Sequence, residues 1–238
     1  MPAAMILAAG RGERMRPLSD DIPKPLLMAG GKPLIVRQIE ALRAAGIRDI
    51  VINASHLAHV LQQALGDGAA FDVHIDWSIE PEPLETAGGI ATAYPLLRAP
   101  VILIVSGDIV TDFPYATLLE RAQGMGRDAS SPRVHFVMVP NPDYHREGDF
   151  ALADGMIRDE APRLTFGNIA LYDAALFAEL PRGEKLKLLP LFRAWIGAGV
   201  VSGELYHGRW SNVGTPADLA VLDRELLAQS EGRVGAAV

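Results

Sequence analysis

The stretch best suited to chemistry is a glycine-containing, cationic segment that follows the first apolar run. Residues 5–9 are apolar, and Gly10, Gly12, Arg14 and Lys24 follow shortly after them. Glycine lets backbone N–H groups turn toward an anion because no Cβ stands in the way. Side-chain cations then neutralise charge that backbone groups leave uncompensated. The segment therefore predicts a phosphate-binding loop.

The same glycines also have a simpler interpretation, because Gly-x-Gly after a strand often forms only a tight turn. The Walker pattern is absent, since no Gly-Lys-Ser/Thr follows. The dinucleotide fingerprint is absent too, since no third glycine stands at the required spacing. The phosphate hypothesis therefore depends on the whole string from Ala8 to Leu26.

Asp108 is the carboxylate whose position best suits a metal ion. It follows the buried apolar run 102–105 and a Ser-Gly pair, at the point where a strand is expected to end. A carboxylate there can bind Mg²⁺ through one oxygen and leave other positions for water and phosphate. An Asx-type turn or a helix cap is the alternative, and the upstream phosphate loop favours the metal. Asp112 is expected either to cap the next helix or to orient the residues that contact the ligand.

Alternating strand and helix patterns in the first half predict an α/β fold with helices on both faces of a parallel-type sheet. Ligands in such sheets bind at the carboxyl ends of strands, which is where the loop after residue 9, the segment 80–89 and Asp108 fall. The predicted strands are 5–9, 50–52, 73–77 and 100–105, and the predicted helices are 33–46, 56–65 (capped by Ser55) and 86–94.

In the second half of the chain the regular alternation of strand and helix patterns ends. This change predicts a smaller lobe inserted beside the same cleft. We expect a loop at 124–132, a hairpin at 149–157, strands at 134–139, 164–172 and 200–206, and helices at 186–196 and 216–227. These patterns favour a single domain over residues 1–229, with the smaller lobe at about 140–205 and a flexible tail at 230–238.

The composition excludes several classes of protein. The chain has 238 residues, 49% of them hydrophobic, and a formal net charge of -7, which disfavours nucleic acid as a partner. It has no cysteine, so disulfides, thiolate metal sites and a cysteine nucleophile are excluded. No apolar run approaches the length of a membrane span, and no signal segment opens the chain, so the cytoplasm is the expected location.

The string from Ala8 to Leu18, followed by Pro23-Lys24-Pro25-Leu26, resembles the signature of the sugar-1-phosphate nucleotidylyltransferases. The resemblance implies an enzyme that joins a nucleoside triphosphate to a sugar-1-phosphate and releases pyrophosphate. It also implies a Rossmann-like three-layer α/β/α sandwich with a mixed, mainly parallel sheet and a small inserted sugar-binding lobe. A monomer or a small homo-oligomer, with no nucleic acid or membrane partner, fits this class.

The resemblance also implies roles for individual residues. Arg14 would face the β- and γ-phosphates, and Lys24 the α-phosphate. Mg²⁺ would be held by Asp108 and Asn212, where Asn212 stands in a string that usually carries a second aspartate; a turn asparagine is the alternative. An asparagine oxygen can bind Mg²⁺ but adds no negative charge. The implied nucleotide contacts are Leu7, Ala9, Gly10, Gly12, Glu13, Glu80, Glu85 and Gly88.

Segment 82–90 is similar to a subgroup of that family, the N-acetylmuramate-1-phosphate uridylyltransferases, with Glu85 where most relatives have glycine. The strings Gly148-Asp149-Phe150 and Lys187-Leu188-x-Pro190 fit the same subgroup. The implied substrates are UTP and N-acetylmuramate α-1-phosphate, and the implied sugar-phosphate contacts are Asp149, Asn168 and Lys187. A hairpin aspartate, a strand-edge asparagine and a solvated lysine are their respective alternatives.

Two other functions remain open from the sequence. One is a mannose- or heptose-1-phosphate guanylyltransferase on the same fold, because Glu80 alone does not decide between uracil and guanine. The other is a nucleotide-binding regulatory subunit without catalysis, against which the presence of Arg14, Lys24 and Asp108 argues.

Overall fold

A nine-stranded mixed sheet forms the centre of the protein in the computed structural model, which describes residues 3–128 and 131–235. The strand order is β5-β4-β1-β6-β11-β8-β12-β10-β9. Parallel pairing joins β5 (His74–Ile79), β4 (Asp49–Ala54), β1 (Ala3–Leu7) and β6 (Val101–Ser106). The carboxyl ends of these four strands therefore meet at one edge of the sheet.

Helices cover both faces of this parallel half because its strands are apolar on both sides. In β1, Ala4 and Ile6 pack into a core with α1 (Leu34–Ala44) and α2 (Ala58–Leu65), whereas Met5 packs into a second core with α3 (Glu85–Ala93). α4 (Ala116–Ala122) joins the first core through Leu118. Two apolar cores on opposite faces of one sheet make the three layers.

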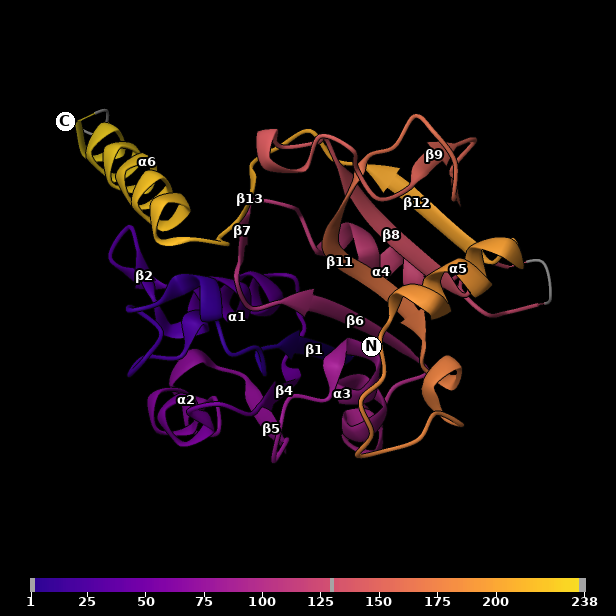
Figure 1. The fold of residues 1–238 in the computed structure, drawn as a ribbon, viewed down its shortest axis with the longest axis horizontal. Coiled ribbons are helices and arrows are strands. Elements are labelled where there is room, and N and C mark those ends of the chain that lie inside the picture. Colours follow the sequence, from indigo (N-terminus) through magenta and orange to yellow (C-terminus); the bar gives the residue numbers. More distant parts are fainter. Residues whose placement is uncertain (1–2, 129–130, 236–238) are drawn as a thin grey trace.

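The remaining strands form the upper right part of the molecule in Figure 1. β11 (Thr165–Asp173) pairs antiparallel with β6 and with β8 (Val134–Val139), and β8 pairs parallel with β12 (Val201–Leu205). The hairpin of β9 (Ala151–Ala153) and β10 (Met156–Arg158) ends the sheet. α5 (Leu189–Gly197) packs Phe192 against Phe136, Phe150 and Phe166.

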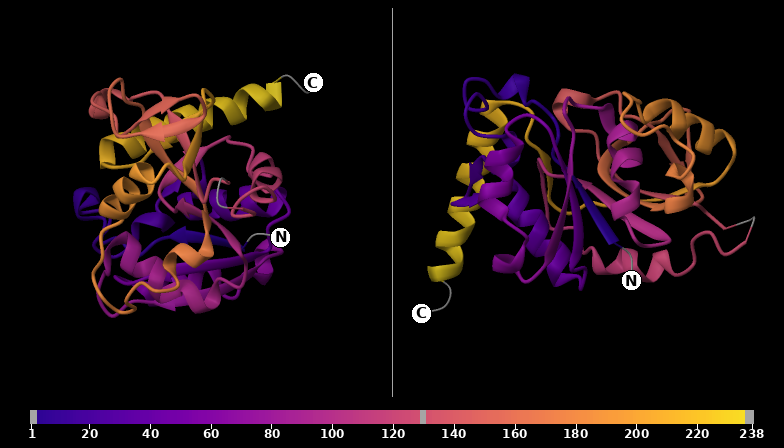
Figure 2. Two further views of the ribbon diagram at one scale, coloured as in Figure 1. Left: turned by 90° about the vertical axis from the view of Figure 1, so that its right-hand side faces the viewer. Right: turned by 90° about the horizontal axis from the view of Figure 1, so that it is seen from below.

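Short strands and the C-terminal helix connect this upper part to the N-terminal loop. β7 (Ile109–Thr111) pairs with β13 (Trp210–Asn212), and β2 (Met28–Ala29) pairs with β3 (Lys32–Pro33). α6 (Pro216–Gly235) packs Leu219 and Leu222 into a third apolar cluster with Met15, Leu27, Ala29, Leu34, Val110 and Val213. The far end of α6 projects from the body (Figures 1 and 2).

The predicted α/β fold with a mixed sheet is confirmed, and most predicted elements are present within a few residues. Ser55 does not cap α2: the helix starts after Leu57, which has φ 55°, and the Ser55 carbonyl accepts the N–H of Ala58. Asp112 does not cap α4, whose N-cap residue is Tyr115; the Asp112 carboxylate accepts the hydroxyl of Tyr206 instead. α6 continues to Gly235, beyond residue 230, and residues 236–238 lie outside the described part.

No helix within the described residues is long and apolar enough to cross a membrane.

Candidate nucleotide-binding site

A cavity of about 850 Å³ opens at the edge of the sheet where the parallel strands end. Ten of the residues expected from the sequence line it: Leu7, Ala9, Gly10, Gly12, Glu13, Arg14, Lys24, Glu80, Glu85 and Asp108. Gly88, Asp149, Asn168, Lys187 and Asn212 do not line it. The structure therefore brings the predicted phosphate residues, most of the predicted base wall and Asp108 together in one cavity, while Gly88, Asn212 and the predicted sugar contacts lie outside its lining.

The glycine loop is folded back onto the segment that carries Lys24. Gly12 has φ 64°, a left-handed conformation that glycine adopts without strain. Its carbonyl accepts the N–H of Met15 at 2.8 Å and the hydroxyl of Ser19 at 2.7 Å. A Cβ at Gly12 would lie 3.1 Å from the Cβ of Lys24, whereas one at Gly10 would meet no atom within 4 Å. The loop is thus packed against Lys24 and Ser19 at Gly12, whereas the space beside Gly10 is open.

Lys24 and Asp108, which are 84 residues apart in sequence, form a direct ion pair in the cavity. Their side chains are only 13% and 28% exposed. Lys24 opens a short 3-10 helix, Lys24–Leu26, with proline on either side, which restricts its backbone. The pair joins the cationic segment to the end of the strand that precedes Asp108.

Asn212 lies next to Asp108 through the pairing of β13 with β7. Asn212 is opposite Ile109, and the N–H of Val213 donates to the Asp108 carbonyl at 3.1 Å. The Asn212 Oδ1 is buried and has no hydrogen-bond partner among the described residues. A buried, unpartnered acceptor costs about 1–3 kcal/mol, so this oxygen is suited to a cation or to water bound to one.

These two oxygen donors fit a hard divalent cation. No group of three or more His, Cys, Asp or Glu residues that could hold a metal occurs in the described part of the chain. A magnesium-type ion needs few protein ligands when substrate phosphate and water complete its coordination. The donor set of Asp108 and Asn212 therefore suits an ion that arrives with a nucleotide.

Arg14 lies against the turn that starts α6. A Cβ at Gly214 would lie 3.7 Å from the guanidinium Nη1 of Arg14. The turn is fixed by Asp218, whose carboxylate accepts the N–H groups of Gly214 at 3.1 Å and Thr215 at 2.8 Å. The Thr215 hydroxyl oxygen accepts the N–H of Asp218 in return, which makes a capping box. Asp218 was missed in the sequence, although Thr-x-x-Asp is the signal for such a cap.

Glu80 supports the wall of the cavity through bonds to the protein. It is 2% exposed, and its carboxylate accepts Asn53 Nδ2 at 2.7 Å and the N–H of Leu84 at 2.9 Å. Asn53 Oδ1 in turn accepts the N–H of Ala8 at 2.9 Å. Burial raises the pKa of Glu80, and the two hydrogen bonds offset part of the rise. The network fixes the turn 81–84 relative to the end of β1. No sequence pattern indicates the role of Asn53 in it.

Glu85 carries a side chain in a backbone conformation that favours glycine. Its φ is 61°, so a side chain is held in the left-handed region at the first residue of α3. This conformation costs a non-glycine residue roughly 1 kcal/mol. Glu85 keeps the conformation at a position that lines the cavity.

Gly88 lies behind the wall, against residues 184–186. A Cβ there would lie 2.1 Å from the Glu184 carbonyl, so only glycine fits this contact. From the same segment, Lys185 lines the cavity and donates to Glu82 at 2.6 Å, whereas Lys187 is exposed outside it. Lys185 was not singled out from the sequence, because a lysine in a polar stretch has no distinguishing pattern.

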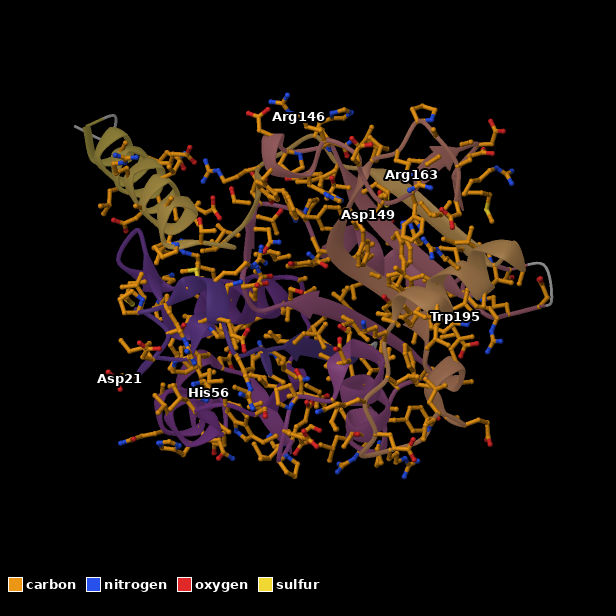
Figure 3. All side chains as sticks on the ribbon, viewed as in Figure 1. Asp21, His56, Arg146, Asp149, Arg163 and Trp195 are labelled. Atoms are coloured by element: carbon orange, nitrogen blue, oxygen red, sulfur yellow. The ribbon has the colours of Figure 1, made fainter. Side chains whose placement is uncertain are left out.

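Asp149 and Asn168 belong to the upper part of the molecule. Asp149 accepts the N–H of Phe166 at 2.8 Å and contacts His145 Nε2 at 3.1 Å. Figure 3 shows Asp149 in this upper part, far from His56 and Asp21 at the opposite rim. Asn168 has φ 57° at an irregularity in β11. Their contacts with a sugar phosphate stay predictions.

The part of the chain that carries the glycine loop and Asp108 matches a known family. The sequence model described as Nucleotidyl transferase covers residues 3–148. The chain belongs to this nucleotidyl transferase family, as the resemblance of its N-terminal string indicated.

Two curated relatives narrow the comparison. The N-acetylmuramate alpha-1-phosphate uridylyltransferase of Neisseria meningitidis serogroup B (strain ATCC BAA-335 / MC58) is 43% identical over 217 residues, which cover 89% of this chain and 93% of that protein. The mannose-1-phosphate guanyltransferase of Gibberella zeae is 30% identical over 233 residues, which cover 90% of this chain and 61% of that protein. The chain thus spans about three-fifths of the guanyltransferase.

Solved structures share the fold. A putative glucose-1-phosphate thymidylyltransferase from Bacillus anthracis superposes with a TM-score of 0.81 at 20% identity, covering 94% of this chain and 95% of that one. HddC from Yersinia pseudotuberculosis superposes with a TM-score of 0.75 at 23% identity, covering 94% and 99%. The predicted fold class therefore agrees with solved structures.

Proposed function

We propose that the protein transfers the uridylyl group of UTP to N-acetylmuramate α-1-phosphate, which yields UDP-N-acetylmuramate and pyrophosphate for peptidoglycan recycling. The contact of Lys24 with Asp108 beside the glycine loop carries this proposal, because it unites phosphate-binding and metal-binding groups in one cavity. The 43% identity to the Neisseria uridylyltransferase supports the choice of substrates.

In the proposed reaction a phosphate oxygen of the sugar attacks the α-phosphorus of UTP in line. The new P–O bond forms while the bond to pyrophosphate breaks, and pyrophosphate leaves with the electron pair. Negative charge grows on the α-phosphate oxygens and on the leaving group, so fixed cations lower the barrier. Arg14 would neutralise charge on the β- and γ-phosphates. Lys24, which pairs with Asp108 in this structure, would bind the α-phosphate in place of that carboxylate.

Asp108 and Asn212 would hold the divalent cation, for which we propose Mg²⁺. The ion supplies positive charge to the phosphates of the nucleotide. Leu7, Ala9, Gly10, Gly12 and Glu13 would surround the triphosphate. The wall of residues 80–86, with Gly88 behind it, would receive the base. Asp149, Asn168 and Lys187 remain the proposed contacts to the sugar phosphate. We also propose a cytoplasmic location and a monomer or small homo-oligomer.

Pyrophosphate release tests this function directly. The protein is assayed with each of the four nucleoside triphosphates against N-acetylmuramate, N-acetylglucosamine and mannose 1-phosphates. We expect the largest kcat/KM with UTP and N-acetylmuramate α-1-phosphate. A preference for GTP with mannose 1-phosphate would replace the proposal with the guanylyltransferase, the activity named for the Gibberella relative.

Lys24→Met tests whether the cavity is catalytic. Removal of a preorganised cation that stabilises transition-state charge lowers kcat by about 10²–10³-fold. Lys32→Met is the matched control, because Lys32 pairs with Glu40 at a surface site outside the cavity. Turnover that is unchanged in Lys24→Met would show that Lys24 has no catalytic role, and a wild type that binds nucleotide without any pyrophosphate release would favour a nucleotide-binding regulatory subunit.

A further inference from the structure

A segment from the second half of the chain, residues 183–188, lies across the first turn of α3 as a strap. The Leu186 carbonyl accepts the N–H groups of Ala87 at 2.9 Å and Gly88 at 3.1 Å, and the Leu186 N–H donates to the Leu84 carbonyl at 3.0 Å. The N–H groups of Ala87 and Gly88 belong to the first turn of α3, where backbone N–H groups find no partner within the helix itself. The strap thus caps α3 and is fixed to the wall of the cavity.

Two further contacts set the position of the strap. The Gly183 N–H donates to the Thr92 hydroxyl at 2.9 Å, and that hydroxyl donates to the Gly88 carbonyl at 2.7 Å. On the other side, the Glu184 carbonyl occupies the space that a side chain at Gly88 would need. The backbone is therefore held on both sides of Lys185.

Lys185 consequently lines the cavity from a fixed backbone, and its ammonium group bonds to Glu82, another lining residue. Four cations line the cavity within the described part of the chain: Arg11, Arg14, Lys24 and Lys185. The first three come from the N-terminal loop, so Lys185 alone among them faces the cavity from the wall of residues 82–86. One of its three N–H donors bonds to Glu82 at 2.6 Å, which leaves two for a ligand.

The chemistry of this position matches the base of the nucleotide. With phosphates at the glycine loop and Asp108, as proposed above, the wall of residues 82–86 and Lys185 is the part of the cavity left for the nucleoside. Uracil presents a carbonyl oxygen at C4, which accepts a hydrogen bond. Cytosine presents an amino group there, which is itself a donor. An ammonium group therefore favours uracil and disfavours cytosine, because donors facing one another leave both without an acceptor.

We propose that Lys185 is a specificity-determining residue for the base: its ammonium group donates to the C4 carbonyl of uracil, and the strap holds it at that place. The proposal rests on the uridylyl function proposed above and adds a residue that the catalytic scheme does not use. Glu82 orients the ammonium group by occupying its third donor. The two side chains are 57% and 62% exposed, so the pair can admit a base without a large rearrangement.

The test compares UTP with CTP in Lys185→Met, Lys185→Arg and the control Lys32→Met, which removes a lysine from an exposed pair away from the cavity. In Lys185→Met we expect the UTP-to-CTP ratio of kcat/KM to fall about tenfold. The KM for the sugar phosphate and the melting temperature should stay unchanged. Lys185→Arg keeps donors and should retain most of the preference.

A ratio that is unchanged in Lys185→Met, or that falls equally in Lys32→Met, overturns the proposal. Equal losses with UTP and CTP together with a lower melting temperature overturn it as well, since they show a structural strap only. The wild-type protein reports separately on the proposed function. If it prefers GTP, the uridylyl function fails, whatever the variants do to UTP and CTP.

Discussion

Asn212, which we propose as a ligand of the cation, has a neutral, buried oxygen without a hydrogen-bond partner among the described residues. Asn212→Asp adds a negative charge beside Asp108, and ligand charge raises the affinity for hard cations. We expect Mg²⁺ to bind the variant about tenfold or more tightly. Without metal the new buried carboxylate should lower the melting temperature. Thermal melts with and without Mg²⁺ measure both effects, and the Mg²⁺-induced shift should exceed that of the wild type.

Ser211→Asp is the matched control for this change. It adds the same charge one residue earlier in β13, where the alternation of a strand points the side chain to the other face. If Mg²⁺ stabilises both variants equally, the charge acts through the general field and Asn212 is not a ligand.

Glu85 allows backbone strain and side-chain chemistry to be separated. Glu85→Ala and Glu85→Gly both remove the carboxylate, but only glycine is unstrained at φ 61°. We therefore expect Glu85→Gly to be more stable than Glu85→Ala by about 1 kcal/mol. Urea denaturation gives the two free energies of unfolding. Equal stabilities would contradict a strained conformation at this residue.

Residue types and spacing were sufficient to find the parts of the site that are close in sequence or follow a strand. The glycine loop, Lys24 and Asp108 carry such signals, and all of them line the cavity. Lys185 and Asn53 carry none, because their positions follow from the strap and from the register of β4 with β1. These are tertiary contacts between distant segments, which local patterns do not encode.

At the scale of elements, the contact between α3 and the strap depends on the absence of a side chain at Gly88. Gly88→Ala would place Cβ 2.1 Å from the Glu184 carbonyl, so the strap must move. We expect a loss of about 1–3 kcal/mol in stability and a higher KM for UTP, because Lys185 moves with the strap. Chemical denaturation and initial-rate kinetics measure the two effects.

Gly197→Ala provides the matched control, since a Cβ at the end of α5 would meet no atom within 4 Å. It should leave the KM for UTP unchanged and keep or slightly raise stability. If Gly88→Ala behaves in the same way, the strap does not depend on the close contact.

The main strands and helices were predictable because each carries a sustained apolar pattern. The two-stranded pair of β7 and β13 was not predicted, since three-residue strands are too short to show a period. The predicted helix at 186–196 begins at Leu189, because residues 184–186 contact α3. The cap expected at Ser55 failed for a similar reason: Leu57 adopts a left-handed turn that no local residue type indicates.

At the scale of the whole molecule, α6 supports the N-terminal loop that contains Arg14 and Lys24, through the third apolar cluster. Leu222 is 2% exposed and shares this cluster with Met15, the neighbour of Arg14. Leu222→Ala should cost about 2–5 kcal/mol and raise the KM for UTP, because the loop loses its packing. Val221→Ala is the control on the same helix, since Val221 is 46% exposed and should change stability by less than about 0.5 kcal/mol. Thermal unfolding and kinetics with UTP distinguish the two variants.

The packing of α6 under the N-terminal loop also dictates an order of events during synthesis. Met15, Leu27 and Leu34 leave the ribosome long before Leu219 and Leu222, which cover them in the finished fold. A nascent chain that has not yet reached α6 therefore exposes an apolar patch at the N-terminal loop. A chain cut before α6 should therefore keep the N-terminal loop but lose the apolar cover that Leu219 and Leu222 provide.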